Sequence, residues 1–253
     1  MFTIKDTLFI GKSFIDLAII DSTNNYAQQL LANSQPADGT LISTFNQNKG
    51  KGYHNNTWLS EANKNLSFSI ILYPNFIDAH QQFYLNMAIS IAIVEALNDY
   101  SKKEFLIKWP NDIYFNKKKI GGILIENSII GSKINTCIIG VGLNINQKNF
   151  NAALPNPSSL KLITNKTTDL YKLLNELVKS IESKYQILQS GAFEQLAQQY
   201  KNQLYGINKL LKFKIDGNLF EGIIKGVDDF GRLVISENSI EKKYHYKEIE
   251  YVF

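Results

Sequence analysis

Charged and amide side chains interrupt three apolar stretches of the chain, residues 106–114, 119–126 and 138–146. The polar members of these stretches include Lys108, Asn111, Asp112, Lys119 and Asn144. Apolar runs rich in β-forming residues predict strands, and a charge within a sheet is tolerated only when it is paired or bound to a ligand. The three stretches therefore indicate a sheet whose face or rim is a binding site.

A second polar segment, residues 46–58, contains Gly50, Lys51 and Gly52. It is longer than an ordinary hairpin loop, and its glycines and lysines are suited to surrounding an anion. Neither G-x-x-x-x-G-K-[ST] nor G-x-G-x-x-G ahead of a helix occurs in it. The segment is therefore either a phosphate-binding loop of another geometry or a solvated loop.

Asp21, Ser22 and Thr23 precede a run that predicts a helix. In the simplest interpretation, one of these side chains caps the first turn by accepting from its exposed amides. The same amides and hydroxyls can also receive a ligand rich in acceptors. The two roles are compatible.

The composition is typical of a globular protein with a sizeable core, since 44% of the 253 residues are hydrophobic. The formal net charge of +4 is too small to indicate nucleic-acid binding by itself. The single cysteine, Cys137, lies in an apolar run, which predicts a buried thiol and a reducing cytoplasm. The sequence shows neither a signal peptide nor a stretch long enough to span a membrane, so no membrane partner is expected.

Residue periodicity predicts an α+β fold in two parts. Strands are predicted at 39–45 and 65–73, and helices at 79–100, 169–189 and 193–204. From Gly206 onward, strands predicted at 210–215, 220–227, 232–236 and 243–252 alternate with turns such as Asp216–Gly217, which describes a small β-barrel module. The expected domains are residues 1–205 and 206–253.

Two motifs resemble the core of the biotin protein ligases: Lys108-Trp109-Pro110-Asn111-Asp112, and Lys119 followed by Gly121-Gly122-Ile123-Leu124-Ile125-Glu126. Other features of that family follow the same order along this chain, namely Ser22-Thr23-Asn24, Gln47, Trp58, Gly140-Val141-Gly142-Leu143-Asn144-Ile145-Asn146 and the small terminal β module. The resemblance covers nearly the whole chain, and the combination of the two central motifs is specific.

The resemblance implies a mixed sheet like that of the catalytic domains of class II aminoacyl-tRNA synthetases, followed by an SH3-like barrel. It also implies a ligase that uses Mg²⁺ and ATP to form biotinyl-5'-AMP from biotin. The enzyme would then transfer biotin to a lysine of a biotin carboxyl carrier protein domain, as in acetyl-CoA carboxylase. A homodimer formed through sheet edges is compatible with the pattern.

The resemblance assigns residues to both substrates. The biotin side is implied to include Ser22, Thr23, Asn24, Gln47, Gly50, Lys51, Gly52, Tyr53, Trp58, Lys119, Gly121 and Gly122. The ATP and adenylate side is implied to include Lys51, Tyr53, Lys108, Asn111, Asp112 and Asn144.

The implied catalytic residues are Lys119, Lys51 and Asp112. Lys119 would stand beside the biotin carboxylate and the forming acyl-phosphate, where fixed positive charge has its largest effect. Lys51 and neighbouring amides would hold the phosphate, and Asn144 would bind the adenine. Three roles are open for Asp112: a magnesium ligand, a residue that sets the phosphate geometry, or a base for the acceptor amine.

The loop departs from the family pattern G-R-G-R-x-G-x-x-W, because Lys51, Tyr53 and Asn55 replace both arginines and the third glycine. Arginine binds phosphate with two parallel hydrogen bonds and lysine as a point charge, so weaker retention of the adenylate is expected. No tryptophan follows Asn144, which leaves the residue that covers the adenine undefined.

Other interpretations compete with this one. Lys119 belongs to a run of three lysines that could be a solvated face, and Asn111 and Glu126 could be ordinary hydrogen-bonding residues of the sheet. A lipoate or octanoate ligase of the same fold is the main alternative, although the first motif with the terminal barrel favours biotin. A biotin-responsive DNA-binding repressor is not expected, because Ser22 lies too near the first residue for a preceding winged helix-turn-helix.

Overall fold

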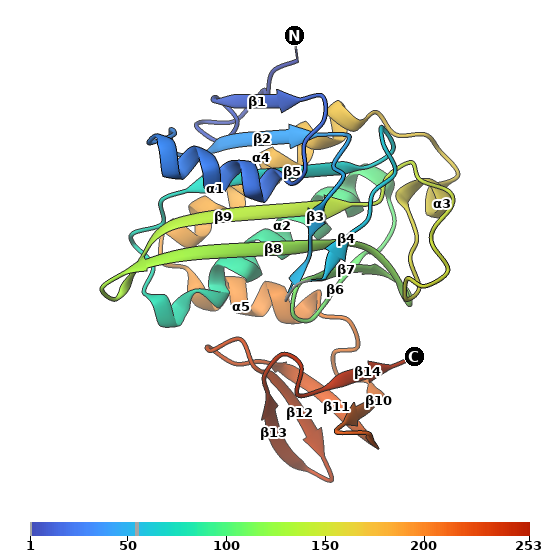
Figure 1. The fold of residues 1–253 in the computed structure, drawn as a ribbon. Coiled ribbons are helices and arrows are strands. Elements are labelled where there is room, and N and C mark those ends of the chain that lie inside the picture. Colours follow the sequence, from blue (N-terminus) through green and yellow to red (C-terminus); the bar gives the residue numbers. More distant parts are fainter. Residues whose placement is uncertain (1, 54–55) are drawn as a thin grey trace.

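The structure is a computed structural model that describes residues 2–53 and 56–253, so the prediction for Asn55 lies outside the described residues. A mixed sheet of seven strands forms its larger part (Figure 1). In spatial order the strands are β1 (Phe14–Leu17), β2 (Thr40–Thr44), β5 (Leu66–Leu72), β9 (Lys133–Leu143), β8 (Lys118–Ile130), β7 (Asp112–Phe115) and β6 (Leu106–Lys108). Strands β1 and β2 are parallel, and the other neighbours pair antiparallel. The predicted α+β class is confirmed.

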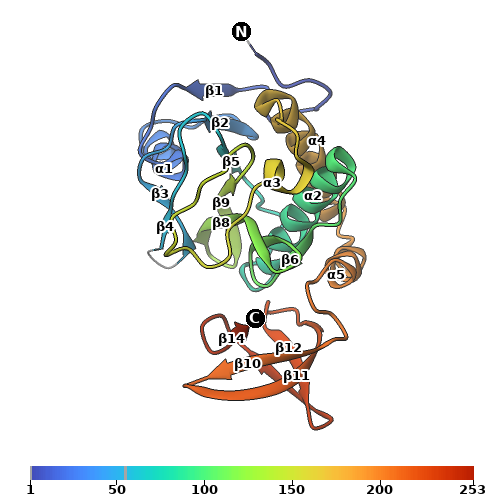
Figure 2. The ribbon, with the colours of Figure 1, turned by 90° about the vertical axis from the view of Figure 1, so that its right-hand side faces the viewer.

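Helices cover both faces of this sheet (Figure 2). Helices α2 (Phe83–Ser101), α4 (Leu170–Gln189) and α5 (Phe193–Asn202) pack together on one face, and α1 (Thr23–Asn33) lies on the other. The helix predicted from residue 79 begins as the 3-10 turn η2 (Ala79–Gln81) and continues as α2. A further short helix, α3 (Leu160–Thr164), lies between β9 and α4 along the chain.

Two predicted strands are divided in the structure. The stretch 106–114 forms β6 and β7, which pair with each other through Lys108 and Asp112. The turn between them contains Pro110, which has no N–H to donate to a ladder. The stretch 243–252 is likewise interrupted, and Lys247 in the interruption has a positive φ of 74°. Within the polar segment 46–58, β3 (Gly50–Lys51) and β4 (Thr57–Trp58) form a short ribbon.

A five-stranded antiparallel sheet forms the C-terminal module. Its strands in spatial order are β13 (Ile240–Tyr244), β12 (Leu233–Glu237), β11 (Asn218–Val227), β10 (Leu210–Ile215) and β14 (Glu250–Val252). The predicted hairpin turn at Asp216–Gly217 is confirmed, because both residues have the positive φ that such a turn requires. The expected domain boundary after residue 205 falls between α5 and β10.

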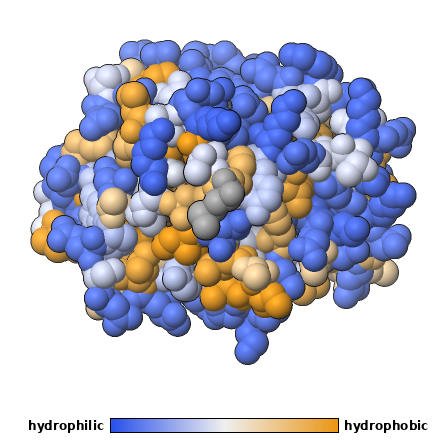
Figure 3. Space-filling model, turned by 90° about the horizontal axis from the view of Figure 1, so that it is seen from above, coloured by the Kyte–Doolittle hydropathy of each residue, from blue (hydrophilic) through white to orange (hydrophobic). Residues whose placement is uncertain are grey.

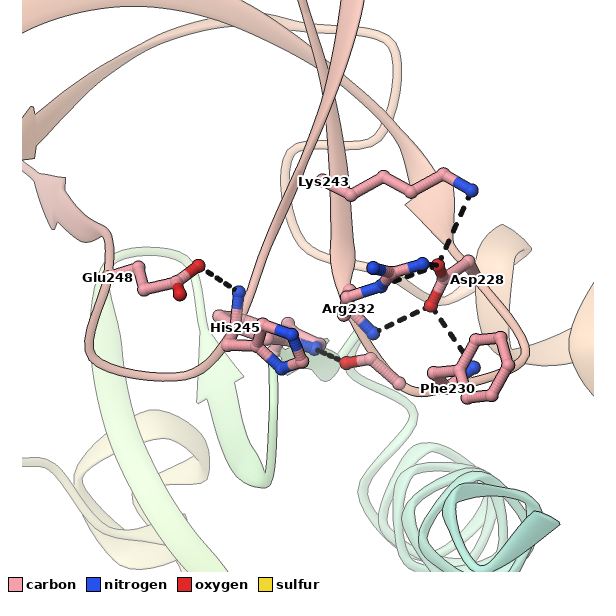
Figure 4. A network of polar contacts seen from close by, with 8 residues as sticks. Asp228, Phe230, Arg232, Lys243, His245 and Glu248 are labelled. Carbon is pink, nitrogen blue, oxygen red and sulfur yellow. Dashed lines mark hydrogen bonds and ion pairs between the residues drawn. The ribbon is translucent and has the colours of Figure 1, made fainter. Parts of the chain in front are cut away.

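A turn of the module, residues 228–232, contacts the larger part of the fold. Figure 4 shows the Asp228 carboxylate accepting from the backbone N–H groups of Phe230 and Arg232 and from the Arg232 guanidinium, at 2.7 Å for its Nη2. These contacts hold the turn so that the Gly231 carbonyl accepts from Trp109 Nε1 at 2.9 Å. The module is therefore anchored beside the first central motif.

The surface seen from above is mostly hydrophilic, with apolar residues in several patches between the polar ones (Figure 3). Among the described helices, none combines the length and the apolar character needed to cross a membrane. The thiol of Cys137 is free and buried, as its apolar surroundings predict.

Candidate active site

A cavity of about 710 Å³ opens between the large sheet, the first turn of α1, the segment 46–58 and the C-terminal module. Most of the expected site residues line it: Ser22, Thr23, Asn24, Gln47, Lys51, Gly52, Tyr53, Trp58, Lys108, Asn111, Asp112, Lys119 and Gly122. Residues as far apart in sequence as Ser22 and Lys119 therefore share one site.

Gly50, Gly121 and Asn144 are expected site residues that do not belong to the cavity wall. The two glycines allow close approach of the backbone. A Cβ added at Gly50 would lie 2.5 Å from the carbonyl oxygen of Trp58, and a Cβ added at Gly121 would lie 2.7 Å from the carbonyl oxygen of Gly142. Asn144 is buried, and its Oδ1 has no hydrogen-bond partner in the described part of the chain. Its role at the adenine stays a prediction.

An ion pair joins the two central motifs. Lys119 Nζ lies 2.6 Å from Asp112 Oδ1, and the side chains are 31% and 18% exposed. The register of β7 and β8 shifts between Ile113 and Tyr114, so that Asp112 lies opposite Gly122 and Tyr114 opposite Lys119. Lys118 is exposed, because neighbouring residues of a strand point to opposite faces. Lys117 precedes the strand and is also exposed, so Lys119 is the member of this run of lysines that lines the cavity.

Lys108 lies among aromatic rings. Its Nζ is 4.5 Å from the ring centre of Tyr251, 5.3 Å from that of Tyr114 and 5.9 Å from that of Phe253, distances suited to cation–π attraction. Burial lowers the pKa of Lys108, although Asp112 nearby acts in the opposite direction. Two of the three rings belong to the C-terminal module, which therefore contributes to the surroundings of this cation.

The polar group at α1 is held by hydrogen bonds. Ser22 caps the helix, as predicted, by accepting from the backbone N–H of Asn25. Thr23 donates its backbone N–H to Gln47 Oε1 at 2.9 Å. The side chains of Ser22, Thr23 and Asn24 are each less than 5% exposed. These residues form a rigid polar end of the cavity, suited to a ligand that carries both donors and acceptors.

The ribbon β3–β4 closes the cavity from the side of the polar segment. The indole ring of Trp58 lies against Gly142, so closely that a Cβ added at Gly142 would lie 2.6 Å from the indole Nε1. At the tip of the ribbon, Tyr53 contacts Tyr246 of the C-terminal module edge to face, with ring centres 4.6 Å apart. The Gly52 N–H, expected at a phosphate, here donates to the Asn56 carbonyl at 2.7 Å.

Several wall residues were not expected from the sequence. Six come from the C-terminal module: Tyr246, Lys247, Ile249, Glu250, Tyr251 and Phe253. Nothing in their local pattern predicts contact with residues more than a hundred positions earlier. Gly140 and Gly142 belong to the stretch 138–146 that was expected in the binding sheet, were not assigned to a substrate, and also line the cavity. Two glycines at alternate positions of a buried strand are the signal that could have identified them, because glycine in a strand often marks close approach of another group.

Known proteins resemble this chain over most of its length. Residues 17–144 match the biotin/lipoate A/B protein ligase family. The chain is 28% identical over 247 residues to the bifunctional ligase/repressor BirA of Bacillus subtilis, covering 96% of this chain and 75% of that protein. It is 24% identical over 241 residues to the biotin–[acetyl-CoA-carboxylase] ligase of Mycobacterium tuberculosis, covering 92% of this chain and 88% of that protein.

A solved structure agrees with these matches. The biotin protein ligase of Aquifex aeolicus, in complex with biotin and ATP, has a TM-score of 0.80 and 26% identity to this chain. The similarity covers 95% of this chain and 99% of that chain. The chain belongs to the biotin/lipoate A/B protein ligase family.

Proposed function

We propose that this protein is an ATP-dependent biotin–protein ligase that forms biotinyl-5'-AMP and transfers biotin to a lysine of a biotin carboxyl carrier protein domain. The observation that carries the proposal is the Lys119–Asp112 ion pair, which lies in the wall of the same cavity as the polar end at α1. The names of the similar proteins and the biotin and ATP bound in the similar structure support it.

In the first step, a biotin carboxylate oxygen attacks the α-phosphorus of ATP and pyrophosphate leaves. Two anionic groups must approach each other, so a fixed cation between them stabilises the transition state. We assign this role to Lys119, which Asp112 orients through the 2.6 Å contact. Lys51 lines the cavity from the ribbon and supplies positive charge on the phosphate side.

In the second step, the neutral amine of the acceptor lysine attacks the carbonyl carbon of the anhydride, and AMP leaves. The attacking nitrogen loses a proton, for which Asp112 is the carboxylate nearest to Lys119. Closure of the ribbon against the C-terminal module, through Tyr53 and Tyr246, keeps water from the anhydride before the acceptor arrives.

Magnesium is expected to enter with ATP. Among the described residues, no group of three or more histidine, cysteine or acidic side chains could hold a metal ion. Mg²⁺ in sites that bind a nucleotide usually takes most of its ligands from the phosphates and water, and here Asp112, the carboxylate beside Lys119, would be its protein ligand. The ion, when bound, neutralises negative charge on the phosphates.

Mass spectrometry of a purified carrier domain tests the function. Incubation with this protein, ATP, Mg²⁺ and biotin should add one biotinyl group to the acceptor lysine, and replacing that lysine with alanine should abolish the addition. A parallel reaction with lipoate or octanoate tests the alternative substrate. Modification by either of these acids, with none by biotin, would contradict the proposal.

Substituting Lys51 with alanine should chiefly speed the escape of biotinyl-adenylate. Lys51 is exposed at the cavity mouth, so its loss removes a phosphate contact and leaves Lys119 in place. Biotinylation of a free amine such as hydroxylamine should increase relative to transfer to the carrier. Lys49→Ala is the matched control, because this exposed lysine of the same segment is not part of the cavity wall. Equal leakage from both variants would contradict the assignment of Lys51.

The Michaelis constant for ATP should rise as the pH increases. This rise should begin at a lower pH than the titration of an ordinary lysine, whose pKa is about 10.4. The pKa of Lys108 is lowered by burial, so its ammonium loses its charge earlier as the pH increases. Steady-state kinetics from about pH 7 to pH 10 would measure this rise. Lys108→Arg, which stays charged, should flatten the profile, and an unchanged profile in Lys108→Arg would exclude Lys108 as its origin.

We also propose a cytoplasmic location, which agrees with the free, buried thiol of Cys137. We further propose that two copies pair through an outer strand of the large sheet, such as β1. Light scattering after gel filtration, with and without biotin and ATP, measures the mass. DNA is not among the proposed partners, and a mobility-shift experiment at controlled salt tests that statement.

A further inference from the structure

Glu126 contacts the polar end of the cavity without being part of its wall. Its Oε2 accepts from Asn24 Nδ2 at 2.7 Å, and its Oε1 accepts from Gln28 Nε2 at 3.0 Å. Asn24 lines the cavity and is 3% exposed, whereas Gln28 is exposed to solvent. Glu126 can therefore act on a ligand through Asn24.

The charge of Glu126 determines which way the Asn24 amide faces. An ionised carboxylate only accepts hydrogen bonds, so the NH₂ group of Asn24 must face it. The Asn24 Oδ1 then faces Ser69, whose Oγ lies 2.6 Å away. Ser69 is fully buried in β5, next to Gly140 of β9. Its hydroxyl therefore donates to Asn24.

Further polar contacts join Ser69 to Thr23 and Thr23 to Gln47. Ser69 Oγ lies 2.8 Å from the Thr23 hydroxyl, which in turn lies 3.3 Å from Gln47 Oε1. The Thr23 hydroxyl also has a single proton, which it can donate either to Ser69 or to Gln47. The Thr23 backbone N–H donates to Gln47 Oε1 at 2.9 Å, which leaves the Nε2 of Gln47 as its donor end. Glu126 thus fixes the donors and acceptors of Asn24 and Ser69, whereas the Thr23 backbone N–H fixes the Gln47 amide separately.

We propose that Glu126 is a positioning residue that sets this donor and acceptor pattern and thereby makes the site selective for an acid that carries a cyclic urea. The inference rests on the proposed function. A urea presents one carbonyl acceptor between two N–H donors, so it requires fixed donors and acceptors around it. A plain acyl chain has no such groups and gains nothing from the pattern, which would separate biotin from the other acids used in this family.

The test is calorimetric binding of biotin and of octanoate in the absence of ATP, with adenylate kinetics alongside. Glu126→Ala lets the Asn24 amide turn over, and should weaken biotin binding about tenfold or more because buried polar groups lose their partners. The affinity for octanoate and the Michaelis constant for ATP should change less than about twofold, which is much smaller than the expected loss of biotin affinity. Glu126→Gln can still accept from Asn24 while Gln28 turns in solvent, so it should restore biotin binding nearly to the wild-type value.

Glu126→Lys gives the opposite constraint, since an ammonium only donates and forces the Asn24 Oδ1 toward it. Biotin binding by this variant should be weaker than by Glu126→Ala. Gln28→Ala is the matched control, because it removes the solvent-side partner of Glu126 and keeps the Asn24 contact. Its biotin affinity should equal that of the wild type.

Ser69→Ala provides a second variant should the Glu126 variants melt early. It removes the donor to Asn24 Oδ1 and should also weaken biotin binding more than octanoate binding. Two results for Glu126→Ala would overturn the inference and leave the proposed function standing. One is a biotin affinity within about twofold of the wild type, which is far from the loss of about tenfold that is expected. The other is an equal loss of affinity for biotin and for octanoate. A wild-type protein that binds no biotin would overturn the proposed function as well.

Discussion

Substitution of Lys119 with alanine is expected to nearly abolish formation of biotinyl-adenylate. Loss of one fixed electrostatic group at a reacting centre costs about a hundredfold to a thousandfold in kcat. Lys119 lines the cavity and is held by Asp112 at 2.6 Å, so a mobile cation or water cannot replace its charge at the same position. Release of pyrophosphate and chromatography of the adenylate measure the effect.

The fold should survive this change. Both members of the ion pair are partly exposed, and exposed pairs contribute little to stability. Thermal melting followed by circular dichroism should therefore be close to that of the wild type. Lys118→Ala is the matched control, because its side chain is exposed and outside the cavity wall. Adenylate synthesis at the wild-type rate by Lys119→Ala would show that the assignment is wrong.

Substitution of Gly140 with alanine is expected to raise the Michaelis constant for biotin about tenfold or more, since forcing atoms into a packed site costs one to three kcal/mol. An added Cβ would lie 2.8 Å from Cγ of Asn24 and 3.0 Å from its Nδ2. Asn24 cannot easily give way, because Ser69 and Glu126 hold it on both sides. Steady-state kinetics with biotin as the varied substrate measures the change.

Gly122→Ala separates this effect from a general intolerance of alanine in the site. A Cβ at Gly122 would lie 3.6 Å from the nearest atom, Asp112 Oδ1, which is an ordinary contact. The biotin constant should therefore change less than in Gly140→Ala. In addition, Gly140→Ala should add little to Asn24→Ala, because the group it displaces is already gone. Additive effects of the two changes would contradict this explanation.

Local features of the fold were predicted well from the sequence. A cap from one of residues 21–23, the hairpin at Asp216–Gly217 and a buried helix at 79–100, observed as a 3-10 turn and then a helix over 83–101, depend on residues a few positions apart. The division of the stretch 106–114 was missed, because a run of β-forming residues gives no sign of where a chain reverses. Pro110, which cannot donate to a ladder, is the residue that could have indicated it.

The candidate site was predicted as a set of residue types and not as an arrangement. Gly121 and Gly122 appear equivalent in the motif, yet Gly122 lines the cavity and Gly121 packs against the Gly142 carbonyl. Successive residues of a strand point to opposite faces, so adjacent members of one motif have different surroundings. The proximity of the C-terminal module to Lys108 had no counterpart in the motifs.

The sequence by itself determined which chemistry is available: a lysine and a carboxylate in adjoining motifs, a polar helix start and a segment rich in glycine and lysine. The tertiary structure decided which of these groups meet. Asn24 and Glu126 are 102 positions apart and Trp109 and Gly231 are 122 apart, yet each pair forms a hydrogen bond. Periodicity, caps and turns arise from interactions between near neighbours, whereas such contacts depend on strand register and on how the two parts of the fold pack together.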